Sequence, residues 1–206
     1  MSVTVQIKQK SIFKKKLNID DIINLTDLSY GVSDENFRLI RDEKANHTLI
    51  YDKTKLARGI DLWLEGTDIM LSLSLPTSSS EIKLFYNVIE KICNKLNISK
   101  YLRDDVQVNI CDNKKYIKYD EDTSVVALED IEAKTGDSYQ RFELFGVFNP
   151  ISIGQNELKK INHNLDNFEE FLNEIQSLDV YYSTPSVYKN KNTNKNIMII
   201  TYFVFR

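Results

Sequence analysis

The sequence predicts an α+β fold in which an antiparallel sheet of about eight to ten strands carries about three to five helices. Two observations lead to this prediction. Most strand-like segments follow one another directly along the chain, and only a few amphipathic helical segments interrupt them. Three prolines and six glycines in 206 residues favour continuous secondary structure. We expect a single domain over residues 1–206, with a small N-terminal subdomain over residues 1–45 as the alternative.

The chain begins with a predicted strand and a short predicted helix. Val3 to Ile7 alternates apolar and polar residues, which is typical of a half-buried strand. Asn18 precedes Ile19 as a helix cap, and acids at positions 20 and 21 lie where the helix dipole favours negative charge. We expect this helix to end near Thr26.

The middle of the chain carries the clearest pattern. Three strands are expected, over His47–Asp52, Gly59–Leu64 and Ile69–Leu75. Residues 65–68 between the last two favour a hairpin turn. Ser78 and Glu81 have the spacing of a capping box, and apolar residues then recur on one helical face. This predicts a helix over about Ser79–Leu96.

The second half is expected to continue as alternating short elements. We expect strands over Val106–Ile110, Tyr116–Tyr119 and Tyr139–Phe148, and a short helix over Val125–Lys134 that ends at Gly136. A helical region over Gln155–Ser177, broken near residues 162–164, precedes two final strands over Asp179–Ser183 and Ile197–Phe205.

Charge is segregated along the sequence. Residues 1–16 hold five lysines and no acid, and residues 180–206 hold four basic residues and no acid. Residues 104–143 hold eleven acids and five bases, a net charge of −6. Such blocks are typical of different faces of one fold, and they can steer a charged partner during association.

Residue types that carry most metal and acid–base chemistry are scarce. The two histidines, His47 and His163, and the two cysteines, Cys93 and Cys111, show no metal-ligand spacing. Residues 120–124 resemble the first ligands of an EF-hand loop, but later positions lack its glycine and glutamate, so we interpret residues 120–122 as a solvated loop. We expect no metal and no cofactor.

Catalysis is the weaker hypothesis. His163 near Asp166 could act as a base with an orienting carboxylate, but such a pair is more often a solvated helix surface. No glycine-rich phosphate loop is present. We lean against an enzyme, and keep an enzyme or small-ligand binder with a polar pocket near His47 or His163 as the alternative.

The acidic middle of the chain predicts a surface that binds a protein. Carboxylates can present a negative face to a basic partner, and tyrosines among them are typical binding anchors. The candidate partner-binding residues are Asp104, Asp105, Asp112, Tyr116, Tyr119, Asp120, Glu121, Asp122, Glu129 and Asp130.

Nucleic-acid binding is a second alternative. Tyrosines near Lys189, Lys191 and Lys195 could hold a single strand by stacking and charge. A sequence pI near 5.5 argues against it, because such binders are usually basic overall.

The N-terminus lacks an apolar signal segment, and the longest apolar stretch is too short to span a bilayer, so we expect a cytoplasmic protein without a membrane segment.

Two stretches resemble a known class of protein. They are LPTSSSEIKLFY at residues 75–86 and LDNFEEFL at residues 165–172, which continues to DVYY at residues 179–182. They are similar to small bacterial proteins classed as domains of unknown function, some of which lie among the immunity proteins of polymorphic toxin systems. The resemblance spans about half the chain, contains no diagnostic motif and carries over no catalytic residue. It implies a cytosolic protein that neutralises a toxin domain by binding it.

Overall fold

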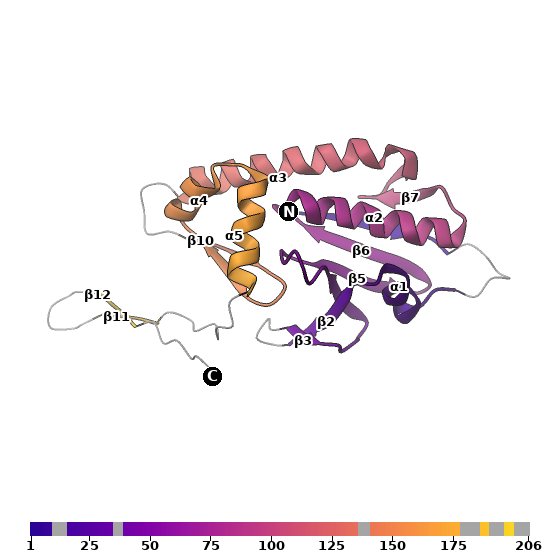
Figure 1. The fold of residues 1–206 in the computed structure, drawn as a ribbon, viewed down its shortest axis with the longest axis horizontal. Helices are drawn as coiled ribbons and strands as arrows, with labels where there is room; N and C mark the ends of the chain where they lie inside the picture. The colour runs from indigo at the N-terminus through magenta and orange to yellow at the C-terminus, as the bar shows by residue number, and fades with distance from the viewer. Residues whose placement is uncertain (10–15, 35–38, 136–140, 178–185, 190–195, 200–206) are drawn as a thin grey trace. The chain divides into compact units, whose positions relative to one another are not determined.

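The computed structural model describes residues 1–9, 16–34, 39–135, 141–177, 186–189 and 196–199 (Figure 1). The chain divides into two compact units, Met1–Gln176 and Ser177–Arg206. In the second unit, β11 (Ser186–Lys189) pairs with β12 (Asn196–Ile199) in an antiparallel hairpin. The fold that positions the candidate site belongs to the first unit.

An eight-stranded antiparallel sheet forms the centre of the first unit. Its strand order is β3-β2-β4-β5-β6-β1-β7-β8, so the N-terminal strand lies inside the sheet and β3 and β8 form its edges. The bounds are β1 Ser2–Ile7, β2 Ser29–Ser33, β3 Leu39–Arg41, β4 His47–Tyr51, β5 Ile60–Glu65, β6 Asp68–Ser74, β7 Lys100–Arg103 and β8 Val106–Asn109.

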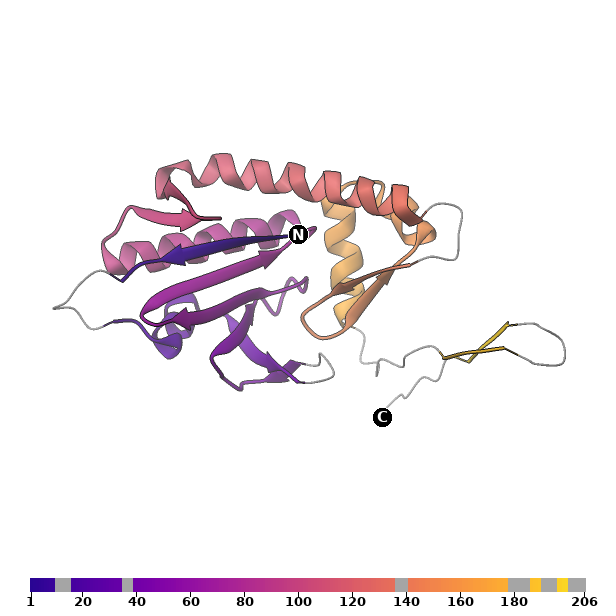
Figure 2. The same cartoon turned by 180° about the vertical axis from the view of Figure 1, so that it is seen from behind.

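Two helices pack on one face of this sheet. They are α1 (Ile19–Thr26) and α2 (Ser79–Leu96), and α2 crosses in front of the strands in Figure 1. Figure 2 brings the opposite face forward, and no described helix covers the centre of that face. Alternation along the strands sends apolar side chains toward α2, where they are removed from water. The core includes Val3, Val5, Ile60, Leu62, Ile69, Leu71, Leu73, Ile82, Phe85, Ile89 and Ile92.

A smaller second core follows in sequence. It is built from the C-terminal half of α3 (Asn113–Thr135), the hairpin of β9 (Phe142–Phe145) and β10 (Pro150–Ile153), and the helices α4 (Gln155–Ile161) and α5 (Leu165–Ser177). Its buried members include Leu128, Ile131, Leu144, Ile151, Ile153, Leu158, Ile161, Phe168 and Leu172. The helix α3 therefore takes part in both cores, because its N-terminal half lies beside the sheet.

Most of the predicted elements are confirmed. The fold is α+β with a large antiparallel sheet, and the helix Ser79–Leu96 has the predicted bounds. The predicted break in the later helical region falls at Asn162 and His163, whose φ angles are 49° and 52°. One half of the predicted capping box of α2 is present, because Ser78 Oγ accepts a hydrogen bond from the Glu81 amide. The Glu81 carboxylate instead accepts main-chain amides of the β4–β5 connection.

The predictions around α3 are wrong. Residues 116–119 are helical rather than a strand, and residues 125–134 are the end of a 23-residue helix rather than a separate short one. Residues 120–122 are helical too, not a solvated loop. The physical reason is that the buried stripe of α3 is largely polar, so the apolar period of a helix is missing. Its buried polar members are Asn113, Asp120, Ser124 and Thr135.

Several short strands were not predicted, namely β2, β3, β7, β10 and β11. The predicted strand at 139–148 is confirmed only over β9. The predicted strand at 179–183 lies outside the described residues, and of the last predicted strand only residues 197–199 are described, within β12.

Candidate functional site

The candidate site is built on the hairpin between β7 and β8. Asp104 and Asp105 form its two-residue turn, and both have positive φ, 46° and 65°. This combination is that of a type I′ turn, whose twist matches the strands that it joins, and aspartate tolerates the left-handed region better than most residues. The turn places Arg103 directly opposite Val106 in the ladder, so both side chains lie on the same face of the sheet.

Arg103 lies at the centre of a buried polar network. Its guanidinium donates to the carboxylate of Asp120 on α3, and its Nε donates to the hydroxyl of Tyr86 on α2 at 3.1 Å. The Tyr86 hydroxyl donates to the other Asp120 oxygen at 2.6 Å. Nη1 of Arg103 also bonds Asp104 at 2.9 Å. Three elements, β7, α2 and α3, are therefore joined at one point.

Burial dominates the electrostatics of this network. The Asp120 side chain is fully buried and that of Arg103 is 10% exposed. Burial raises the pKa of Asp120, while the hydrogen bond from Tyr86 and the charge of Arg103 act in the opposite direction. The Tyr86 hydroxyl is also buried and bonded to a carboxylate, so its pKa lies well above the ordinary value. Each polar group has a partner, which is what burial of charge requires.

Two tyrosine rings lie near the guanidinium, and Val106 lies opposite Arg103 in the ladder. The central carbon of the guanidinium lies 5.0 Å from the ring centroid of Tyr116 and 5.6 Å from that of Tyr119. Tyr119 is 59% exposed and Val106 is 61% exposed. We name the surface formed by Asp104, Asp105, Val106, Tyr116 and Tyr119 the Arg103 surface.

The structure separates the ten predicted partner-binding residues. Asp104, Asp105, Tyr116 and Tyr119 are brought together at the Arg103 surface. Asp120 is buried beneath them and cannot present its charge to a partner, which corrects its place in the set. Its burial follows from the inward-facing polar stripe of α3.

The remaining acids lie elsewhere along α3. Glu121 turns toward α2, where it accepts a hydrogen bond from Ser79 and lies 3.6 Å from the Lys83 ammonium. Asp122 is exposed and pairs with Lys118 one helical turn away. Asp112, Glu129 and Asp130 are exposed, and none of the three forms an ion pair with another described residue.

Sequence reasoning missed Arg103, Val106 and Tyr86. The sequence did contain a signal for the hairpin that carries Arg103 and Val106. Side chains alternate between two faces on both sides of the Asp-Asp turn, which is typical of two paired strands. No sequence signal distinguished Tyr86 from other residues of the apolar face of α2.

Two other polar clusters have structural roles. The buried Glu81 carboxylate accepts the main-chain amides of Arg58 and Gly59 and the hydroxyl of Thr77, so it joins the β4–β5 connection to the start of α2. His163 Nε2 lies 2.6 Å from an oxygen of Glu132. The main-chain amide of Asp166, the expected partner of His163, donates a hydrogen bond to the side-chain oxygen of Asn164.

The described ranges hold no group of three histidine, cysteine, aspartate or glutamate side chains placed to bind a metal ion. None of the helices in these ranges is both long enough and apolar enough to cross a bilayer.

Comparison with known proteins identifies a family. The sequence model of a domain of unknown function, DUF4299, matches residues 2–205, nearly the whole chain. No curated protein and no solved structure matches the chain. The match confirms the resemblance to domains of unknown function. The chain belongs to the DUF4299 family.

Proposed function

We propose that this chain is a non-catalytic protein-binding domain whose partner contacts the Arg103 surface. The observation that carries this proposal is the pair of exposed side chains, Tyr119 and Val106, placed beside a guanidinium that is itself almost buried. Tyrosine and arginine are enriched at the energetic centres of protein interfaces, where one aromatic anchor can contribute most of the affinity.

Rigidity supports this choice over other exposed apolar residues. The Arg103 guanidinium is fixed by Asp120, Tyr86 and Asp104, and the tyrosine rings lie against it. A surface that is ordered before binding loses little conformational entropy when the partner arrives. The two-residue turn at Asp104 and Asp105 further limits motion of the hairpin.

Charge around the surface indicates the chemistry of the partner. Asp105 is exposed at the tip of the turn and forms no ion pair with a described residue. Exposed carboxylates at the rim of an interface accelerate association with a basic partner and select it over an acidic one. A basic toxin domain, neutralised by binding, is the partner class that the family resemblance favours.

Copurification with a tagged chain tests the proposal. We expect one stoichiometric protein partner with the wild-type chain, and its loss with the double variant V106A/Y119A. The control is I40A, which removes another exposed apolar side chain at the opposite edge of the sheet. Equal recovery of the partner with V106A/Y119A and wild type, both folded, would falsify the proposal.

A charge reversal tests the partner chemistry. D105K should slow association with the partner, and the slowing should weaken as salt is raised. E65K reverses an exposed acid at the end of β5 and serves as the matched control. Association rates that change equally in both variants would contradict a specific role for Asp105 at this surface.

A further inference from the structure

The strands β1 and β7 separate after only two paired positions. Val5 pairs with Arg103 and Gln6 with Leu102, but the ladder stops there although β1 continues to Ile7 and β7 begins at Lys100. Continuing the register would place Lys8 opposite Lys100. No pairing joins these two residues, so a gap opens between the strands.

The main-chain groups of Lys100 face this gap. The Asp104 amide donates to the Thr4 carbonyl at 2.9 Å, so even-numbered residues of β7 direct their main-chain groups toward β1. Lys100 is the first residue of β7 and follows this alternation, while Lys8 comes directly after the end of β1. The Lys100 N–H therefore points toward the space between the strands.

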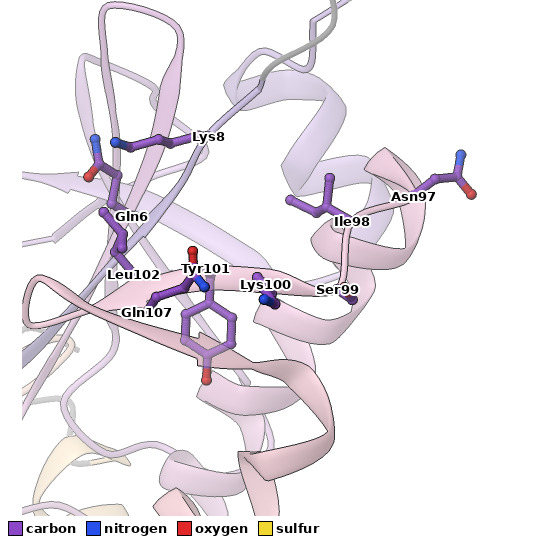
Figure 3. A pocket seen from close by; sticks show the side chains of 9 residues that line it. All are labelled: Gln6, Lys8, Asn97, Ile98, Ser99, Lys100, Tyr101, Leu102 and Gln107. Carbon is purple, nitrogen blue, oxygen red and sulfur yellow. The ribbon is translucent and has the colours of Figure 1, made fainter.

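A cavity of about 360 Å³ occupies the gap (Figure 3). Its volume lies within the range of about 300–1,000 Å³ that is typical of small-molecule sites. Lys8 lies on the β1 side and Lys100 on the β7 side; Leu102 lies near Gln6, and Ile98 lies near Asn97 at the other end of the lining. The Tyr101 ring points away from Lys8, because its hydroxyl bonds Asn113 beneath the sheet.

The cavity is basic. No acid lines it, and neither Lys8 nor Lys100 forms an ion pair with a described residue. Asp68 nearby accepts the side-chain amide of Gln6 at 2.8 Å. Ser99 and Gln107 add a hydroxyl and an amide to the lining. Two like charges on neighbouring strands repel each other, and a bound anion would remove that repulsion.

We infer that this cavity binds a small molecule carrying a phosphate monoester. A phosphate monoester has a charge close to −2 at neutral pH and three strong acceptor oxygens, which match two ammonium groups and adjacent N–H donors. Ile98 and Leu102 would contact a compact body attached to the phosphate.

This site is independent of the proposed protein-binding function. Leu102 and Gln107 pair across the hairpin and point to the opposite sheet face from Arg103 and Val106. A ligand here and a partner at the Arg103 surface would therefore occupy different faces of the same hairpin.

Titration with phenyl phosphate, followed by amide NMR of the full chain at pH 7.5, tests the inference. We expect saturable shifts at the amides of Lys8, Ser99 and Lys100, and binding weakened at least about fivefold in K8Q and in K100Q. K53Q removes an exposed lysine in the β4–β5 connection and should bind as wild type.

Two further arms decide the ligand chemistry. Benzoate should bind more weakly than phenyl phosphate, and a ten-nucleotide oligothymidine should not produce the same shifts at lower concentration. Equal binding of benzoate, preference for the oligonucleotide, or K100Q binding phenyl phosphate as tightly as wild type would each overturn the assignment.

A ligand-free measurement tests the electrostatic basis. K100E replaces the repulsion from Lys8 by attraction, so it should raise the thermal midpoint relative to K100Q and abolish phenyl phosphate binding. K53E measured against K53Q controls for a general effect of lowered positive charge. A midpoint of K100E at or below that of K100Q, with K53E unchanged, would contradict mutual repulsion of the two lysines.

Discussion

The carboxylate of Asp120 and the guanidinium of Arg103 form an ion pair inside the protein, where α3 meets the edge of the sheet. Helices usually pack on sheets through apolar side chains, and the main core of this protein does so along α2. At α3 a satisfied charge pair replaces part of that apolar contact. The position of the Arg103 surface therefore depends on a polar interaction that requires both partners.

Removal of one partner of this pair should be strongly destabilising. D120N keeps the shape of the side chain but leaves Arg103 without its buried counter-charge, and we expect a loss of about 3–5 kcal/mol in the free energy of unfolding. Urea denaturation measures it. D122N, which removes the exposed partner of Lys118, is the control and should be close to wild type.

Replacement of both Arg103 and Asp120 should lower the free energy of unfolding much less than D120N alone does. The double variant R103M/D120L fills a similar volume without buried charge, and its stability should approach that of wild type. A double variant as unstable as D120N would show that shape and the Tyr86 hydrogen bonds, rather than charge compensation, hold α3 in place.

The Glu81 carboxylate should be a second point of strong destabilisation. It is buried and accepts two main-chain amides and one hydroxyl. E81Q presents an N–H group where the protein requires an acceptor, so we expect a loss of about 1–3 kcal/mol in urea denaturation at pH 7. E90Q on the exposed side of α2 is the control. Equal stability of the two variants would contradict the acceptor role of Glu81.

The elements that sequence reasoning predicted well are those with apolar periodicity. The helix Ser79–Leu96 and the β5–β6 hairpin bury apolar side chains at regular spacing, and their bounds follow from that spacing. The helix α3 lacks the pattern, because it packs through Asp120, Ser124 and Asn113 as well as through aliphatic residues. The sequence alone does not show whether a polar residue of a helix lies on its buried face or on its exposed face.

The candidate site was predictable only in part for the same reason. The local cluster of acids and tyrosines was visible, and four of its members meet at one surface. Which acid is buried was not visible, because Asp120 and Asp122 differ only in the direction that the helix gives their side chains. The central role of Arg103 depends on a contact across 17 residues of sequence.

Gln176 should be required for the loop that follows β9. Its side-chain oxygen accepts the amides of Phe148 and Asn149 at 2.6 and 3.0 Å, and its side-chain nitrogen donates to the Asn149 carbonyl at 2.7 Å. Q176A leaves the Phe148 and Asn149 amides without this acceptor in a half-buried loop, whereas the Asn149 carbonyl keeps the Gly146 amide as a donor. We expect a loss of about 1–3 kcal/mol in the free energy of unfolding, measured by urea denaturation. N167A removes a more exposed side-chain amide from α5 and should lower the free energy of unfolding by less. A smaller loss for Q176A than for N167A would contradict this role.

Glu169 should contribute stability that depends on pH. It accepts a hydrogen bond from Ser80 on α2 and lies 2.9 Å from the Lys55 ammonium. Burial acts to raise its pKa, but these hydrogen bonds and the lysine charge outweigh burial and lower the pKa below the ordinary 4.5. The folded protein therefore binds this proton less tightly than the unfolded chain does.

The sign follows from that difference. The contribution of Glu169 is fully present above about pH 4.5 and is lost as the pH falls through the lowered pKa of the folded state. E169Q should therefore lower the urea midpoint at pH 7, and the difference from wild type should shrink between pH 4.5 and pH 3. E170Q on α5 replaces an exposed acid and controls for a general effect of lost negative charge. A difference between E169Q and wild type that stays constant from pH 7 to pH 3 would show that the amide merely packs less well, because a packing defect does not follow the titration of a carboxylate.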